Sequence, residues 1–151
     1  MRIYRIAVTK YCDASGEGAK LYGGRWNFPG NPALYGSASV SSALLERLTV
    51  DSELLSSERY VIYSVMEFKI SDDLAVIPTL GELPIGWNEI PPIQASQEYG
   101  TNLLKSGILC FGIPSVVDQT SLNFVINPLS NSFISVSFDV YPLKLDQRIV
   151  K

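Results

Sequence analysis

The stretch Gly23-Gly24-Arg25-Trp26-Asn27 is the most informative part of this sequence, and Tyr35 and Glu46 follow it at short intervals. Flanking glycines let the backbone approach a ligand closely, and arginine offers a planar fork of donors that matches carboxylate or diphosphate oxygens. Tyrosine adds a flat face for a heteroaromatic ring, and glutamate adds one negative charge. These residue types favour a pocket for a nucleotide that carries a cationic ring, a description that NAD⁺ fits.

The length and composition around this stretch predict one domain, residues 1–151. The chain has 151 residues, of which 46% are hydrophobic and 18% are charged. A core of this size needs neither disulfides nor metals. Eleven glycines and nine prolines indicate many turns and short elements.

The charge pattern argues against nucleic acid as the main ligand. The chain carries 12 basic and 15 acidic residues, for a formal net charge of −3. The basic residues are scattered, so we expect no basic face, although a local arginine pocket for a small anion is compatible with the pattern. Neither a signal peptide nor a run of about eighteen apolar residues is visible, which predicts a cytoplasmic chain without a membrane span.

The absence of histidine narrows the chemistry. Ser/His and Cys/His catalysis and histidine-rich metal centres are excluded, which leaves carboxylate, arginine, tyrosine and serine chemistry. Cys12 and Cys110 are too few and too isolated to indicate a disulfide framework or a zinc site. We therefore expect two free thiols and no metal.

Two helices are expected. Ser37 or Ser39 can cap a helix that runs to about residue 50, and a second helix over residues 95–106 ends at Gly107. Glu46 falls outside the apolar stripe of the first helix. Its carboxylate therefore faces either solvent or a cleft between this helix and the strand that bears Tyr35.

The remaining pattern predicts an α+β fold with a β-rich core. Residues 13–20 are typical of a loop, residues 27–32 of a turn, and residues 78–92 of an ordered but irregular excursion. The strand over residues 60–70 is the clearest, and we expect it to lie centrally. The expected strands are residues 3–8, 33–36, 60–70, 108–113, 123–127 and 133–138.

Each candidate residue also has a structural explanation. A single arginine such as Arg25 is most often paired with a nearby acid, and a tyrosine in a short apolar strand, such as Tyr35, usually belongs to the core. Glu46 alone is typical of a solvated helix face, Ser115 of a turn after a strand, and Asn127 of a turn. Taken singly, these residues leave the function open.

A series of short motifs nevertheless runs in order along nearly the whole chain. They are Gly24-Arg25-Trp26-Asn27 with Pro29-Gly30, Leu34-Tyr35, Ala43-Leu44-Leu45-Glu46, Gly86-Trp87, Pro114-Ser115, Asn123, Asn127-Pro128 and Asp146-Gln147-Arg148. This series resembles the RES domain family, named for its arginine, glutamate and serine. The chain departs from the family pattern at Thr101 and at Leu129-Ser130-Asn131.

The resemblance implies a fold similar to ADP-ribosyltransferases and the activity of a bacterial toxin that destroys NAD⁺. NAD⁺ would be the substrate, with no cofactor, and water, phosphate or a protein would be the acceptor. The implied partner is a DNA-binding, Xre-like antitoxin that covers the active site. A homodimer of the toxin within that complex is a further expectation.

The resemblance also implies roles for single residues. Arg25 would hold the diphosphate, and Tyr35 would pack near the nicotinamide. Glu46 would bind the nicotinamide ribose hydroxyls and stabilise the oxocarbenium-like transition state, with Ser115 holding the substrate or Glu46. The other substrate-binding candidates are Trp26, Asn27 and Asn127.

The missing histidine is compatible with this chemistry. Most glycosidic bonds need an acid to protonate the leaving group, whereas nicotinamide leaves a cationic ring as a neutral base. A fixed carboxylate near the forming cation could supply much of the stabilisation. Two other functions stay open: ADP-ribosyl transfer to a macromolecule, and a β-rich binding module in which Arg25, Tyr35 and Glu46 form only a structural network.

Overall fold

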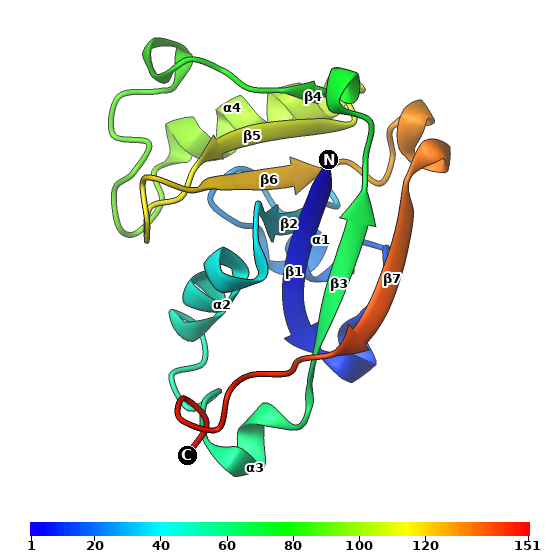
Figure 1. Ribbon diagram of the computed structural model, residues 1–151. Coiled ribbons are helices and arrows are strands. Elements are labelled where there is room, and N and C mark those ends of the chain that lie inside the picture. The colour runs from blue at the N-terminus through cyan, green and yellow to red at the C-terminus, as the bar shows by residue number, and fades with distance from the viewer.

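A curled, seven-stranded sheet organises the chain, in the order β4-β5-β6-β2-β1-β3-β7 (Figure 1). The structure is a computed structural model that describes residues 1–151. All neighbouring strands pair antiparallel except β4 and β5, which are parallel. The strands are β1 Arg2–Val8, β2 Leu34–Ser37, β3 Tyr63–Lys69, β4 Ala75–Val76, β5 Cys110–Pro114, β6 Leu122–Ile126 and β7 Ser137–Pro142. The predicted α+β, β-rich fold class is confirmed.

Four α-helices accompany the sheet: α1 Glu17–Tyr22, α2 Val40–Leu48, α3 Ser57–Tyr60 and α4 Gln94–Lys105. Ser39 begins α2, because its hydroxyl accepts a hydrogen bond from the backbone N–H of Ser42 at 3.1 Å. This is one of the two predicted caps. None of the helices has the length and apolar character that crossing a membrane requires.

Several expectations about single elements were wrong. The predicted loop over residues 13–20 contains α1, which begins after Gly16 in the left-handed region (φ 68°) and ends at Gly23 (φ 74°); both glycines belong to helix ends rather than to a loop. The predicted strand over residues 133–138 is instead a 3₁₀ turn, Asn131–Ser135, followed by β7. The Ser130 hydroxyl begins this turn by accepting from the N–H of Ser132.

The strand predicted over residues 60–70 also needs correction. Tyr60 belongs to α3, since the hydroxyl of Ser56 accepts from the N–H of Arg59 and starts a helical turn there. The strand itself, β3, lies between β1 and the edge strand β7 rather than centrally. The stretch is apolar because both of its faces are buried. An apolar sequence does not distinguish a strand at the centre of a sheet from a strand next to the edge.

The sheet is weakest where β1 meets β2. Seven residue pairs join β1 to β3, from Arg2↔Lys69 to Val8↔Tyr63, whereas the single pair Tyr4↔Ser37 joins β1 to β2. In Figure 1, β5 and β6 run across the direction of β1, β3 and β7, and α2 lies beside the opening between the two groups. The two groups of strands are therefore joined by a single residue pair at this junction.

Side chains alternate between two faces of the sheet and form three apolar clusters. Phe124 and Ile126 of β6 belong to a cluster with Ile3 and Phe68, whereas Val125 between them belongs to a cluster with Trp26 that also includes Leu104 of α4. The third cluster joins Ile6, Val65 and Leu143 to Ala43 of α2. Packing against these clusters fixes α2 and α4 on the sheet and so positions the residues that line the cleft.

Candidate functional site

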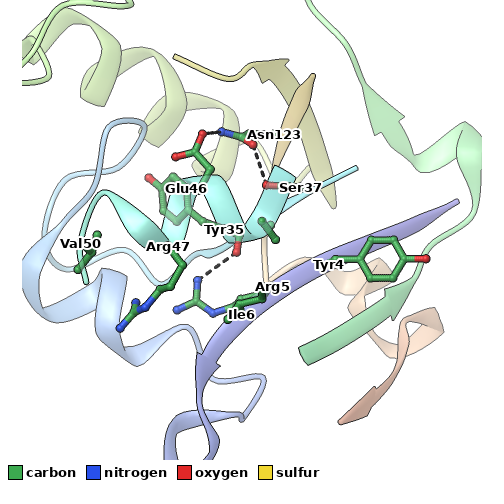
Figure 2. Close-up of a pocket in the computed structure, with 11 residues that line it drawn as sticks. Tyr4, Arg5, Ile6, Tyr35, Ser37, Glu46, Arg47, Val50 and Asn123 are labelled. Atoms are coloured by element: carbon green, nitrogen blue, oxygen red, sulfur yellow. Dashed lines mark hydrogen bonds between the residues drawn. The ribbon is translucent and has the colours of Figure 1, made fainter. Parts of the chain in front are cut away.

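A cleft of about 190 Å³ opens between β1, β2 and the helix α2 (Figure 2). Its lining is mixed, with apolar side chains beside two arginines and one carboxylate. The lining residues are Tyr4, Arg5, Ile6, Tyr35, Gly36, Ser37, Ala43, Glu46, Arg47, Val50 and Asn123. Glu46 therefore faces a cleft, which decides between the two orientations that the sequence allowed.

The carboxylate of Glu46 is held at one oxygen by two donors. The Oγ of Ser115 and the Nδ2 of Asn123 each donate to Oε1 at 2.6 Å. No protein group donates to the other oxygen, Oε2. Charge-assisted bonds of this kind are short and strong, and they fix the side chain in one position. The site thus presents a preoriented carboxylate with one free oxygen.

The two donors are themselves fixed by further bonds. Ser37 Oγ donates to Asn123 Oδ1 at 2.8 Å (Figure 2), which leaves the Asn123 amide nitrogen facing Glu46. Ser115 lies directly after β5 and is 1% exposed. Its hydroxyl accepts from the backbone N–H groups of Val117 and Asp118, both at 3.1 Å, so its own proton is left for Glu46.

Tyr35 contributes the face of its ring rather than a free hydroxyl. The hydroxyl donates to Asn27 Oδ1 at 2.6 Å and accepts from the N–H of Trp26 at 3.0 Å. Burial raises the pKa of this phenol, against smaller lowering effects from the Trp26 N–H and from the charges of Arg25 and Arg5. Tyr35 therefore stays neutral near neutral pH, and its hydroxyl is engaged by Asn27 and Trp26.

The glycine before the arginine has a steric reason. A Cβ on Gly24 would lie 2.7 Å from Tyr35 Oη and 2.9 Å from Tyr35 Cζ. The phenol packs directly on the Gly24 backbone, and a side chain there would push the ring out of place. The loop that carries Gly24 and Arg25 therefore packs directly against Tyr35 of β2.

Arg25 lies next to the cleft but is not among its lining residues. Its Nη1 donates to the carbonyls of Trp87 and Glu89, at 3.0 and 2.7 Å. Burial lowers the pKa of Arg25, and the negative charge of Glu46 raises it by less, which places the guanidinium within electrostatic reach of the carboxylate. Arg25 anchors the irregular segment around Trp87 beside the site.

Two of the predicted substrate-binding residues, Trp26 and Asn27, lie in the interior. Trp26 is 2% exposed and packs against Trp87, Tyr99 and Phe111. Asn27 is 0% exposed, and its side chain is used up by Tyr35 and by three backbone carbonyls. Both side chains shape the loop that carries Arg25 and do not line the cleft.

Asn127 is also interior, at 3% exposed. Its Nδ2 donates to the carbonyls of Leu104 and Ile108, at 2.9 and 3.0 Å, and so ties the end of α4 to the start of β5. The structure does not bring this side chain to the cleft. Its position is that of a residue that stabilises the fold.

The lining residues that were not among the sequence candidates include two with polar side chains, Ser37 and Asn123, and two with charged ones, Arg5 and Arg47. Asn123 appeared in the motif series, but its partners Ser37 and Glu46 lie 86 and 77 residues away. Polar residues at the ends of otherwise apolar strands are the signal that could have marked Ser37 and Asn123. Arg5 and Arg47 carry no motif that points to them.

The arrangement can hold an anion and stabilise a positive charge. A fixed carboxylate, an aromatic face and guanidinium groups line one concave surface, which can bind a ligand with an anionic part and a planar cationic part. The site has no imidazole, because the chain has no histidine. A leaving group that departs without an acid suits such a site.

The chain is similar to known proteins along most of its length. The sequence model of the RES domain matches residues 2–146. The chain is similar to "Toxin Res" of Photorhabdus laumondii, with 34% identity over 100% of this chain and 98% of that protein. It is also similar to the "Prs ADP-ribosylating toxin" of a Sphingobium strain, with 34% identity over 77% and 73% of the two chains.

Among solved structures, a chain of the M. tuberculosis MbcT–MbcA toxin–antitoxin complex has a similar fold. The TM-score is 0.76, with 18% identity, over 95% of this chain and 84% of that chain. At this identity the likeness shows a shared fold.

Proposed function

The chain belongs to the RES domain family, and from this premise we propose that it is the toxin of a toxin–antitoxin pair and that it cleaves the nicotinamide–ribose bond of NAD⁺. One observation carries the proposal: Glu46 is held at Oε1 by Ser115 and Asn123 while Oε2 stays free beside the ring of Tyr35. A carboxylate fixed in advance stabilises a developing cation without having to reorganise.

In the proposed reaction the bond between C1′ of the ribose and the nicotinamide nitrogen breaks, and its electron pair goes to the nitrogen. Nicotinamide leaves as a neutral molecule, so no acid is required. The ribose becomes oxocarbenium-like, and Glu46 stabilises its positive charge. An acceptor oxygen, from water or phosphate, then forms a bond to C1′ and releases a proton to solvent.

The other residues have supporting roles in this proposal. Tyr35 gives its ring face to the nicotinamide end, since its hydroxyl is engaged by Asn27 and Trp26. Arg25 draws the diphosphate toward the cleft by its charge. Ser115 acts through Glu46 as a positioning residue. NAD⁺ is the substrate, and no cofactor takes part.

A partner is part of the proposal, because an enzyme that consumes NAD⁺ needs restraint. The structural neighbour was solved as a toxin–antitoxin complex, and the RES domain links this chain to proteins named as toxins. We therefore expect an antitoxin that covers the cleft between α2 and β2. Purification of the chain with its natural partner is expected to give an inactive complex.

A second candidate is ADP-ribosyl transfer to a protein. The name of one relative, "Prs ADP-ribosylating toxin", favours it. The same cleft would serve, with a nucleophilic side chain of the target in place of water or phosphate. Mass spectrometry of cell proteins after brief expression would detect the added ADP-ribose.

The test of the proposed function uses the full chain freed of any partner. The protein is mixed with NAD⁺, with and without phosphate, and nicotinamide release and the product mass are followed. Glu46→Gln keeps an acceptor at Oε1 but removes the charge, so we expect turnover to fall about 10²- to 10³-fold with no loss of fold.

The matched control is Glu58→Gln, which changes an exposed glutamate on α3 and should leave turnover unchanged. Release that is equal in wild type and Glu46→Gln would contradict the proposal. No release from folded wild-type protein would favour protein transfer, and the absence of modified proteins as well would favour a binding module.

A further inference from the structure

Two arginines from different elements lie together at the wall of the cleft. Arg5 comes from β1 and Arg47 from α2. Both line the cleft beside Glu46 and also a neighbouring groove of about 510 Å³, so they stand between the two hollows. In Figure 2 their guanidinium groups lie side by side, with Glu46 and Asn123 on the other side of Tyr35.

These two positive charges have almost no partners within the protein. None of the five ion pairs of the structure involves Arg5 or Arg47. Arg5 makes a single hydrogen bond, from Nη1 to the carbonyl of Tyr35 at 3.0 Å. The Nε of Arg47 is buried without a partner.

The surroundings hold both side chains in place while leaving their donors free. The guanidinium of Arg47 lies over the Tyr63 ring, 5.4 Å from its centre, a cation–π contact that uses none of its N–H groups. Arg5 is fixed by its bond across the opening between β1 and β2. Burial, and after it the charge of Arg47, lowers the pKa of Arg5.

Nearby carboxylates do not neutralise the pair. Asp13 and Glu17 line the neighbouring groove, and Asp13 acts on Arg5 only through a longer-range attraction. Oδ1 of Asp13 accepts from the N–H and hydroxyl of Ser15, and Asp13 forms no ion pair with either arginine. Glu46 directs its fixed oxygen to Ser115 and Asn123. Two half-buried, mutually repelling guanidinium groups are costly unless a ligand supplies the negative charge.

We propose that Arg5 and Arg47 form a binding subsite for a phosphate group next to Glu46. Two guanidinium groups present more donors than one carboxylate can accept, whereas a phosphate has oxygens for both. Arg5, Arg47 and Glu46 line the same cleft, so the phosphate lies in the hollow that also holds the sugar bound by Glu46. That the phosphate belongs to the NAD⁺ reaction rests on the proposed function; that the pair binds phosphate does not.

Two sources can supply this group: the diphosphate of the dinucleotide, or free inorganic phosphate that acts as the acceptor. The first source predicts that loss of Arg47 raises the KM for NAD⁺. The second predicts that loss of Arg47 raises the phosphate concentration needed for half-maximal release, with the KM for NAD⁺ unchanged.

The direct test titrates the partner-free chain with inorganic phosphate and with inorganic pyrophosphate, by calorimetry and by NMR of the arginine Nε–H signals. We expect binding in wild type, a shift of the Arg47 signal, and a loss of affinity in Arg47→Gln of about 10- to 100-fold. Arg47→Lys keeps the charge but not the fork and should fall between them. Arg2→Gln, which removes an exposed arginine of the same strand as Arg5, should bind as wild type does.

Two results would overturn the subsite: no binding of either anion by folded wild type, or equal affinity in wild type, Arg47→Gln and Arg47→Lys. Kinetics then separate this proposal from the proposed function. Phosphate binding that depends on Arg47 in a chain that releases no nicotinamide would support the subsite and contradict the function. Normal release with unchanged anion binding and unchanged KM in Arg47→Gln would do the reverse.

Discussion

The charged groups on the two walls of the cleft differ in how many hydrogen-bond partners the protein gives them. On one wall, the negative charge of Glu46 is met by Ser115 and Asn123, and Asn123 is held in turn by Ser37. On the other wall, the guanidinium groups of Arg5 and Arg47 make only one hydrogen bond to the protein, from Arg5 to the carbonyl of Tyr35. Both walls border the same hollow, and α2 contributes one residue to each.

The difference separates a group that must be placed before the ligand arrives from groups that the ligand completes. A catalytic carboxylate gains from being rigid, because no energy is then spent on orienting it during the reaction. A binding site for an anion gains from donors that are fixed in space but free to bond. We call the side with Glu46, Ser115 and Asn123 the satisfied wall, because its charge has hydrogen-bond partners, and the side with Arg5 and Arg47 the unsatisfied wall. We expect the satisfied wall to control kcat and the unsatisfied wall to control ligand binding.

The satisfied wall can be broken most severely at Asn123. Asn123→Asp replaces the donor to Glu46 Oε1 with a second carboxylate, and two such groups in contact cannot both stay ionised. We expect kcat for nicotinamide release to fall on the order of 10²- to 10³-fold, with a pH dependence that differs from that of wild type because two coupled carboxylates share the site. Asn102→Asp, at an exposed position on α4, is the matched control for the same chemical change. A wild-type kcat in Asn123→Asp would show that the Glu46 network is not needed for catalysis.

A milder break removes one donor and leaves the other. Ser115→Ala deletes the hydroxyl that donates to Glu46 and also leaves the N–H groups of Val117 and Asp118 without their acceptor. A hydrogen bond to a charged group contributes roughly 1.5–3 kcal/mol, so we expect kcat to fall about 10- to 100-fold.

The split between kcat and KM is the readout that tests the role of Ser115. A positioning residue changes kcat and leaves the KM for NAD⁺ nearly constant. Ser41→Ala, on the exposed side of α2, controls for loss of a serine hydroxyl near the site. A rise in KM at constant kcat would instead assign Ser115 to substrate binding.

The sequence predicted the satisfied wall better than the unsatisfied one. Arg25, Tyr35, Glu46 and Ser115 belong to short motifs, and the structure places all four at or next to the cleft. The orientation of Glu46 could not be decided from the helix alone, because its partners come from β6 and from the residue after β5. A contact across 77 residues leaves no local pattern.

The differences between the sequence expectations and the structure have a common physical cause in tertiary context. Asn27 and Asn127 were predicted to bind substrate, yet their amides serve backbone carbonyls of loops and helix ends in the interior. The strand expected over residues 133–138 shifted because a serine hydroxyl began a 3₁₀ turn at its start. Arg5 and Arg47 belong to none of the motifs, and an unpaired charge is visible only once its neighbours in space are known.

Tyr35 connects the two walls and offers a way to sharpen the comparison. Its carbonyl accepts from Arg5, and its hydroxyl bonds Asn27 and Trp26. Tyr35→Phe leaves a buried acceptor and a buried donor without partners but keeps the ring face. We expect the free energy of unfolding to fall by roughly 1–3 kcal/mol.

Turnover of Tyr35→Phe, measured below its lowered melting temperature, should stay within several-fold of wild type, because the ring and not the hydroxyl faces the ligand. Tyr4→Phe is the matched control, since the hydroxyl of Tyr4 makes no hydrogen bond with the protein and both residues line the cleft. A large loss of kcat in a stable Tyr35→Phe protein would assign chemistry to the hydroxyl.

The smallest expected effect concerns Cys110, a buried residue of β5, the strand that precedes Ser115. Burial raises the pKa of the Cys110 thiol to about 12, from 9.0 in an exposed chain. The folded protein keeps the thiol proton to a higher pH than the unfolded chain does. Stability is therefore complete below about pH 9 and falls as the pH rises toward the folded value. Between pH 8 and pH 10 we expect a loss of about 1 kcal/mol from this residue.

Urea unfolding at pH 8, 9 and 10 measures this loss. Cys110→Ala is less stable at every pH because of the cavity it leaves, but its stability should decline less steeply over the interval. Burial also raises the pKa of Cys12 and of Tyr35, so a smaller alkaline slope remains in the variant. Equal slopes in wild type and Cys110→Ala would mean that β5 admits water to the thiol. The satisfied wall would then rest on a hydrated strand, and the rigidity we assign to Glu46 would need another source.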